Sequence, residues 1–74
     1  MGRPTSVTNH IRALRFARGE MTQAELADML GVTRQTVIAI EQGKYSPTLE
    51  MAFRIARVFG VSLDEVFAYP QEES

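Results

Sequence analysis

The stretch that decides the fold comprises residues 22–43 and reads TQAELADMLGVTRQTVIAIEQG. It opens with a capping box, in which Thr22 is the N-cap of a helix and Glu25 follows three positions later. Gly31 ends that helix, and Thr33 is placed to cap a second helix directly afterwards. Because so few residues join the two helices, the helices are forced to cross steeply.

The same stretch also meets the packing requirements of a steep crossing. Ala27 is small at the point where the two backbones approach, and Gly31 tolerates the positive φ of the turn. Apolar side chains are spaced to hold both helices on the rest of a domain, namely Leu26, Leu30, Val32, Val37 and Ile40. Together these features predict a helix-turn-helix unit over residues 23–42, with its second helix over residues 34–42.

Three further helices are predicted outside this unit. Asn9 is the expected N-cap of a helix that stops at Gly19, and Thr48 caps a longer helix that stops at Gly60. Ser62 opens a short last helix through a second capping box. The helix after Thr48 is expected to bury one apolar stripe, formed by Leu49, Ala52, Phe53, Ala56 and Phe59.

The two ends of the chain contain extended segments. Residues 67–69 form an expected short strand before a proline, and residues 7–8 are its expected partner. We therefore predict an all-α fold of five helices with a short strand pair between the ends. The expected limits are an N-terminal arm over residues 1–8, the helix-turn-helix domain over 9–69 and a frayed acidic tail over 70–74.

Length and composition exclude several function classes. The chain has 74 residues, of which 45% are hydrophobic, so one small domain with a single core is expected. It contains no cysteine and a single histidine, so we expect neither a metal site nor a cofactor. A catalytic base beside a nucleophile and a glycine-rich phosphate loop are also missing, which argues against an enzyme. No apolar run reaches the ~20 residues that cross a bilayer, and no signal peptide opens the chain, so we expect a cytoplasmic protein.

Charge is divided unevenly along the chain, although the net charge is only −1. Residues 1–57 hold eight basic and five acidic side chains, which gives +3, whereas residues 58–74 hold four acidic and no basic side chains, which gives −4. The body of the domain is therefore mildly basic and the acidity belongs to its end. This distribution permits binding to nucleic acid without requiring it.

Several segments together resemble the Cro/CI (Xre) family of helix-turn-helix DNA-binding proteins. They are residues 22–27, 30–37 and 40–44, and the likeness continues through residues 46–49 and 56–67. The resemblance covers residues 9–67 and is strongest to small stand-alone repressors with the lambda-repressor-like five-helix fold. In that family the second helix of the unit enters the major groove, and the first lies across the DNA backbone.

The resemblance implies a role for particular residues. Its base-contacting positions correspond to Arg34, Gln35, Thr36 and Ala39, and its phosphate-contacting positions to Gln23, Thr33, Lys44 and Tyr45. The chemistry is suitable, because arginine pairs with guanine, glutamine with adenine, and the threonine methyl contacts thymine. The side chain of Ala39 is so short that it can make only an apolar contact with a base. Arg15 and Glu41 correspond to a family pair that forms an internal salt bridge.

We expect a homodimeric transcriptional regulator, acting as a repressor on a palindromic operator and associated with the nucleoid. One small module makes few contacts, whereas two bind half-sites about 34 Å apart on one face of the duplex. The expected dimer surface comprises Leu63, Val66, Phe67 and Tyr69, together with Val7. Expected partners are double-stranded DNA and a second copy of the chain, with no membrane and no small-molecule substrate.

Two alternatives on the same fold remain open. The first is a protein-interaction module such as an antitoxin, for which the acidic end of the chain would serve the partner. The second is a controller protein of a restriction–modification system, which differs from a repressor in genomic setting and not in physics.

Overall fold

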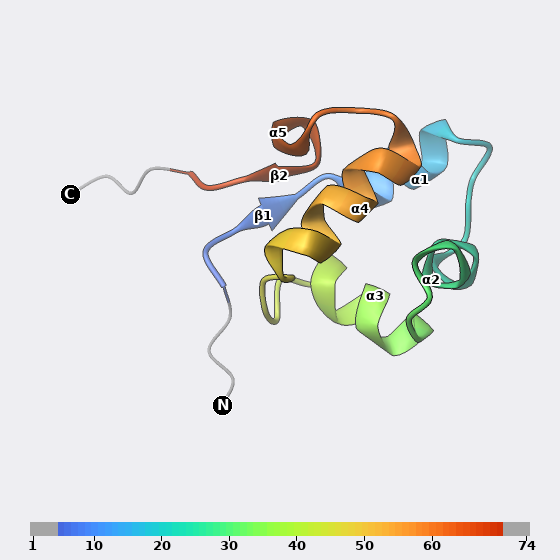
Figure 1. The fold of residues 1–74 in the computed structure, drawn as a ribbon, viewed down its shortest axis with the longest axis horizontal. Coiled ribbons are helices and arrows are strands. Elements are labelled where there is room, and N and C mark those ends of the chain that lie inside the picture. The colour runs from blue at the N-terminus through green and yellow to red at the C-terminus, as the bar shows by residue number, and fades with distance from the viewer. Residues whose placement is uncertain (1–4, 71–74) are drawn as a thin grey trace.

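The computed structural model describes residues 5–70, which form five helices and one strand pair (Figure 1). In chain order the elements are β1 (Thr8–Asn9), α1 (Ile11–Ala17), α2 (Gln23–Leu30), α3 (Arg34–Glu41), α4 (Leu49–Phe59), α5 (Leu63–Val66) and β2 (Phe67–Ala68). The predicted fold of five helices with a strand pair is confirmed. The expected arm and tail fall partly on residues 1–4 and 71–74, which lie outside the described residues.

Local hydrogen bonds explain why α2 and α3 begin where they do. The Thr22 hydroxyl accepts the Glu25 N–H at 3.0 Å, and the Glu25 carboxylate accepts the Thr22 N–H at 2.8 Å. Thr33 caps α3 in a similar way, since its hydroxyl accepts the Thr36 N–H at 3.2 Å. Helix α3 ends at Glu41, one residue before the predicted end.

The turn between α2 and α3 depends on Gly31, which adopts a left-handed conformation with φ of 72°. Its N–H donates to the Asp28 carbonyl at 3.2 Å, and the Val32 N–H donates to the Ala27 carbonyl at 3.0 Å. These bonds satisfy carbonyl groups at the end of α2 that have no partner inside the helix. The chain thereby reverses within three residues and brings α3 directly against α2.

The start of α1 differs from the prediction. Asn9 lies in β1, and His10 occupies the N-cap position without making a side-chain capping bond. The Asn9 side chain nevertheless accepts the Ile11 N–H at 3.1 Å, so it satisfies a helix-start donor from one position further upstream.

The strand pair is antiparallel, with Thr8 opposite Ala68 and Asn9 opposite Phe67. The first strand was predicted over residues 7–8, and this prediction was therefore wrong by one position. The His10 N–H donates to the Val66 carbonyl at 2.8 Å, and this bond at the end of the ladder fixes the register. Figure 1 shows the strand pair at one end of the domain and the α2–α3 pair at the other.

The core lies between α4 and the other helices, and its buried members on α4 are Ala52, Ile55, Ala56 and Phe59. The predicted stripe on α4 was wrong at two positions, because Leu49 is 67% and Phe53 is 54% exposed. Phe53 follows the buried Ala52 by one position and is thus turned about 100° away from it. Leu49 stands at the first position of the helix.

Candidate nucleic-acid interface

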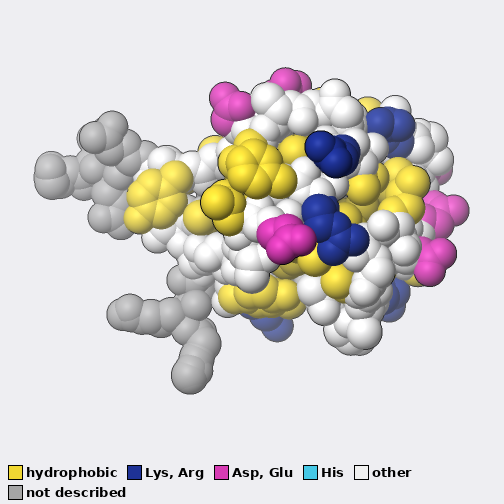
Figure 2. Space-filling model, in the orientation of Figure 1, with side chains coloured by type: hydrophobic (Ala, Val, Ile, Leu, Met, Phe, Trp, Pro, Cys, Tyr) yellow, Lys and Arg dark blue, Asp and Glu magenta, His cyan; other side chains and the backbone are white. Residues whose placement is uncertain are grey.

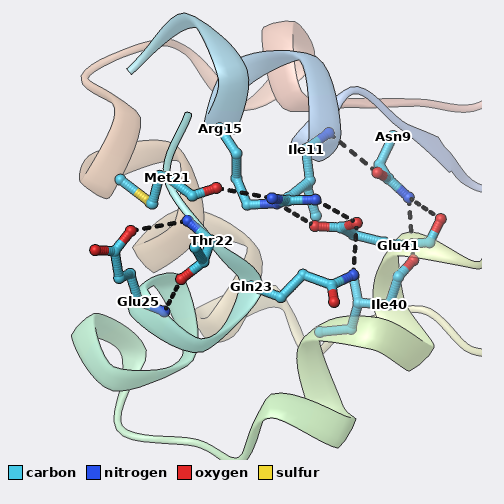
Figure 3. Close-up of polar contacts among 9 residues, drawn as sticks. All are labelled: Asn9, Ile11, Arg15, Met21, Thr22, Gln23, Glu25, Ile40 and Glu41. Carbon is cyan, nitrogen blue, oxygen red and sulfur yellow. Dashed lines mark hydrogen bonds and ion pairs between the residues drawn. The ribbon is translucent and has the colours of Figure 1, made fainter. Parts of the chain in front are cut away.

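Arg15 and Glu41 join α1 to the end of α3 through a buried ion pair (Figure 3). Arg15 Nε lies 2.7 Å from Glu41 Oε2, and Arg15 Nη2 lies 3.1 Å from Glu41 Oε1. The third nitrogen of the guanidinium, Nη1, donates to the Met21 carbonyl at 2.8 Å. The two side chains are only 7% and 10% exposed. Because the geometry is bidentate and fully hydrogen-bonded, the pair fixes the position of α3 relative to α1.

Gln23 at the start of α2 completes this cluster. Its Nε2 donates to Glu41 Oε1 at 3.2 Å, which the sequence did not predict (Figure 3). An amide nitrogen carries two N–H donors, so one remains after the bond to Glu41. Gln23 is thus a half-buried side chain held in one place, at the first turn of a helix whose backbone N–H groups attract anions.

The first turn of α3 presents Arg34 and Gln35 as exposed side chains. Thr36 and Ala39 are half-buried on the same helix. The Thr33 and Thr36 hydroxyl oxygens lie 3.1 Å apart in a hydrogen bond, so both are already part of the helix cap. Of the four side chains expected at the bases, Arg34 and Gln35 reach furthest into solvent and have the polar groups that read base edges.

Lys44 and Tyr45 follow α3 and are both exposed. The Lys44 N–H donates to the Ala39 carbonyl at 3.0 Å, and Gly43 before it has φ of 72°. The backbone of this turn is therefore tied to α3. As a result, both side chains are carried at a fixed position beside the end of that helix.

An open groove of about 690 Å³ lies between α1 and the α2–α3 unit. Gln23 and Arg34 line it, together with Arg12 and Phe16 of α1. Arg12 stacks over the Phe16 ring, with 5.4 Å between Cζ and the ring centroid. Arg12 and Phe16 were not predicted from the sequence as site residues, although their i, i+4 spacing on one helix is a signal for such a pair. The groove thus adds basic and aromatic side chains to the α2–α3 face.

The residues expected at the dimer surface do not all lie on a surface. Val66 is 0% exposed and belongs to the domain's own core, so its assignment to a dimer interface was wrong. Leu63 and Phe67 are half-buried, and Tyr69 is 74% exposed. These three residues line a shallow, mainly apolar depression of about 390 Å³ together with Val7, Asp64 and Ala68. The sequence could not separate Val66 from its neighbours, because a helix of four residues has too few turns to reveal a buried side.

Residues 5–70 lack both a candidate metal site and a candidate membrane span. In that range no group of three or more histidine, aspartate or glutamate side chains is arranged to hold a metal ion. Within the same limits, none of the helices is both long enough and apolar enough to span a bilayer.

Comparison with known proteins places the chain in a family. Residues 11–66 match the family model described as helix-turn-helix. An uncharacterized HTH-type transcriptional regulator of Methanocaldococcus jannaschii is 55% identical over 53 residues, which is 72% of this chain and 80% of that protein. The transcriptional repressor RstR of the cryptic phage CTXphi, from Vibrio cholerae, is 37% identical over 80% of this chain and 52% of its own length. A crystal structure from Bacteroides fragilis superposes with a TM-score of 0.73 at 22% identity, covering 84% of this chain and 98% of that one, which supports the fold.

The chain belongs to the helix-turn-helix family, and its domain is of the Cro/CI (Xre) type. It is a transcriptional regulator with a DNA-binding domain that acts on double-stranded DNA, and its relatives are regulators and not enzymes.

Proposed function

We propose that this protein is a homodimeric repressor that binds a palindromic operator, with α3 of each protomer in the major groove. The observation that carries the proposal is the exposed first turn of α3, where Arg34 and Gln35 project from a helix held by the Arg15–Glu41 pair. Direct readout requires side chains of this kind at a fixed distance from the base edges. Thr36 and Ala39 would add apolar contacts to thymine methyl groups.

Phosphate contacts on both sides of α3 would set the orientation of the helix in the groove. Gln23 retains one amide N–H beside the positive end of the α2 dipole, and Lys44 and Tyr45 extend from the turn after α3. Thr33 is exposed at the α3 N-terminus, and its hydroxyl is the remaining candidate for a contact with a phosphate. These positions flank the base-reading turn, which is the arrangement that a strand of the duplex backbone requires.

Dimerisation is proposed on the apolar depression lined by Leu63, Phe67 and Tyr69, with Val7 beside them. A domain of this size gains too little affinity from one half-site, because specific protein–DNA interfaces bury roughly 1,000–2,500 Å² of protein surface. Figure 2 shows hydrophobic side chains on the side of the domain that carries the strand pair. A symmetric dimer through this surface would cover them and repeat the two recognition helices along one face of the duplex.

Repression would follow from occupation of promoter DNA, in the cytoplasm and on the nucleoid. In this mechanism residues 9–69 are the DNA-binding domain, with residues 1–8 as an arm before it and residues 70–74 as a tail after it. Nothing in this mechanism requires a cofactor or a small molecule.

The test is selection of bound sequences from a random DNA library by the purified protein, followed by titration of the enriched site at increasing salt. We expect an enriched palindrome with half-sites about one helical turn apart, and an affinity that falls steeply with salt because phosphate contacts release counterions. Enrichment of a single half-site would contradict the dimer. No enrichment at low salt, together with a co-purifying second protein, would instead support the protein-interaction module.

A further inference from the structure

One short segment of the chain is hydrogen-bonded to both functional ends of the domain. This connecting segment consists of residues 5–10. The Thr5 N–H donates to the Gly43 carbonyl at 3.1 Å, just after α3, and the His10 N–H donates to the Val66 carbonyl at 2.8 Å, at the end of α5. The segment therefore spans from the recognition helix to the elements that carry the apolar depression.

Asn9 makes the central bonds of this segment. Its Nδ2 donates to the Ile40 carbonyl at 3.0 Å and lies 3.4 Å from the Glu41 carbonyl, while its Oδ1 accepts the Ile11 N–H at 3.1 Å (Figure 3). The amide orientation is unambiguous, because the reverse would place an oxygen against two carbonyl oxygens. The backbone of Asn9 meanwhile pairs with Phe67 in the strand ladder. One residue thus joins the end of α3, the start of α1 and the strand that bears part of the proposed dimer surface.

We propose that Asn9 is a positioning residue that sets the distance and angle between the two recognition helices of the dimer. The inference rests on the proposed function, since it takes the strand-pair end of the domain as the dimer surface. Dimerisation fixes the two dimer surfaces relative to each other. Operator binding, however, depends on the positions of the two α3 helices, which contact the bases. The linkage inside each protomer then decides which half-site spacing fits.

The contacts that hold α3 in its own domain are separate from this linkage. Val37 and Ile40 are buried in the core, and Glu41 is paired with Arg15. Reading of a single half-site therefore does not depend on Asn9. Selectivity for spacing does depend on it, because without the two Nδ2 contacts the end of α3 and β1 can shift against each other.

The experiment compares the wild type with Asn9→Ser on the selected operator and on operators whose half-sites are moved by one or two base pairs. Serine keeps a short acceptor for the Ile11 N–H but cannot reach the α3 carbonyls. We expect the preference for the best spacing to fall roughly fivefold, the equivalent of one net hydrogen bond. Affinity for a duplex with a single half-site should stay unchanged. Thr8→Val is the matched control in the same strand, since Thr8 is exposed and its hydroxyl donates to the Ala68 carbonyl of β2 at 3.4 Å, and it should keep the preference.

The outcomes separate the inference from the proposed function. A wild type that shows no spacing preference would overturn the dimeric operator and the inference with it. A wild type with a preference that Asn9→Ser retains would overturn the inference alone. A measurement on the wild type guards against a variant that fails to fold: when a single half-site duplex binds, the amide resonances of His10, Phe67 and Ala68 should shift. Unshifted resonances there would also overturn the linkage.

Discussion

The guanidinium of Arg15 and the carboxylate of Glu41 meet through two parallel hydrogen bonds although the residues stand 26 positions apart in the chain. The carboxylate also accepts from Gln23, and the guanidinium also donates to the Met21 carbonyl. Over the described residues no buried side-chain nitrogen or oxygen is left without a partner. The cluster can therefore hold a charge pair inside a very small domain and fix the recognition helix by it.

Breaking the Arg15–Glu41 ion pair should lower the stability of the folded protein. Arg15→Ala leaves the Glu41 carboxylate buried without its cation, so we expect the free energy of unfolding to fall by about 3–5 kcal/mol, measured by urea denaturation. Arg18→Ala is the matched control at the C-cap of the same helix, because Arg18 is exposed and its guanidinium donates to the Val58 carbonyl at 3.0 Å. Equal losses in the two variants would contradict a special role for the buried pair.

Sequence discrimination should depend on Arg34. Arg34→Ala removes the side chain proposed to pair with guanine, and we expect discrimination between the operator and a single-base variant to fall by about 1–3 kcal/mol. The measurement is a competition binding assay at fixed salt. Arg57→Ala removes the same charge from an exposed position on α4 and should weaken binding to both sequences alike. If Arg57→Ala reduced discrimination as much as Arg34→Ala, the base-reading assignment would be wrong.

The proposed dimer surface should be sensitive to loss of Tyr69. Tyr69→Ser removes the most exposed aromatic ring beside the depression, and we expect at least about a tenfold rise in the dimer dissociation constant, since aromatic anchors dominate such interfaces. Analytical ultracentrifugation measures this dissociation constant. Phe53→Ser is the matched control, an exposed aromatic residue on α4 outside the depression. A dimer that dissociates in the Phe53 variant and not in the Tyr69 variant would move the interface to α4.

The turn of the helix-turn-helix unit should depend on the backbone of Gly31. A Cβ at this position meets no atom within 4 Å, so the cost of substitution arises from φ of 72° and not from a clash. We expect Gly31→Ala to lower the free energy of unfolding by about 1–2 kcal/mol. Gly31→Asn should cost less, because asparagine adopts the left-handed conformation more easily. Thermal unfolding that ranks the two variants in the opposite order would count against this explanation.

Much of the fold followed from signals that act within four residues along the chain. The Thr22–Glu25 capping box, Gly31 and the threonine caps each satisfy backbone groups of their own helix, so their effect is the same in any tertiary setting. The candidate site was predicted less completely. Arg34 and Gln35 are exposed on the first turn of α3 as expected, whereas the bond between Gln23 and Glu41 joins residues 18 positions apart and had no local signal.

The sequence by itself determined where α2 to α5 begin, where α2 and α4 end, the tight turn between α2 and α3, and the residue types at the base-reading positions. Only the tertiary structure decided the burial of particular residues beside the predicted apolar sides: it left Leu49 and Phe53 in solvent and placed Val66 in the core. It also decided that Asn9 reaches the end of α3. The physical reason is the distance along the chain over which each interaction acts. A cap or a glycine turn is satisfied by its neighbours in sequence, whereas burial and long-range hydrogen bonds depend on which elements pack together, and that is settled only when the whole core closes.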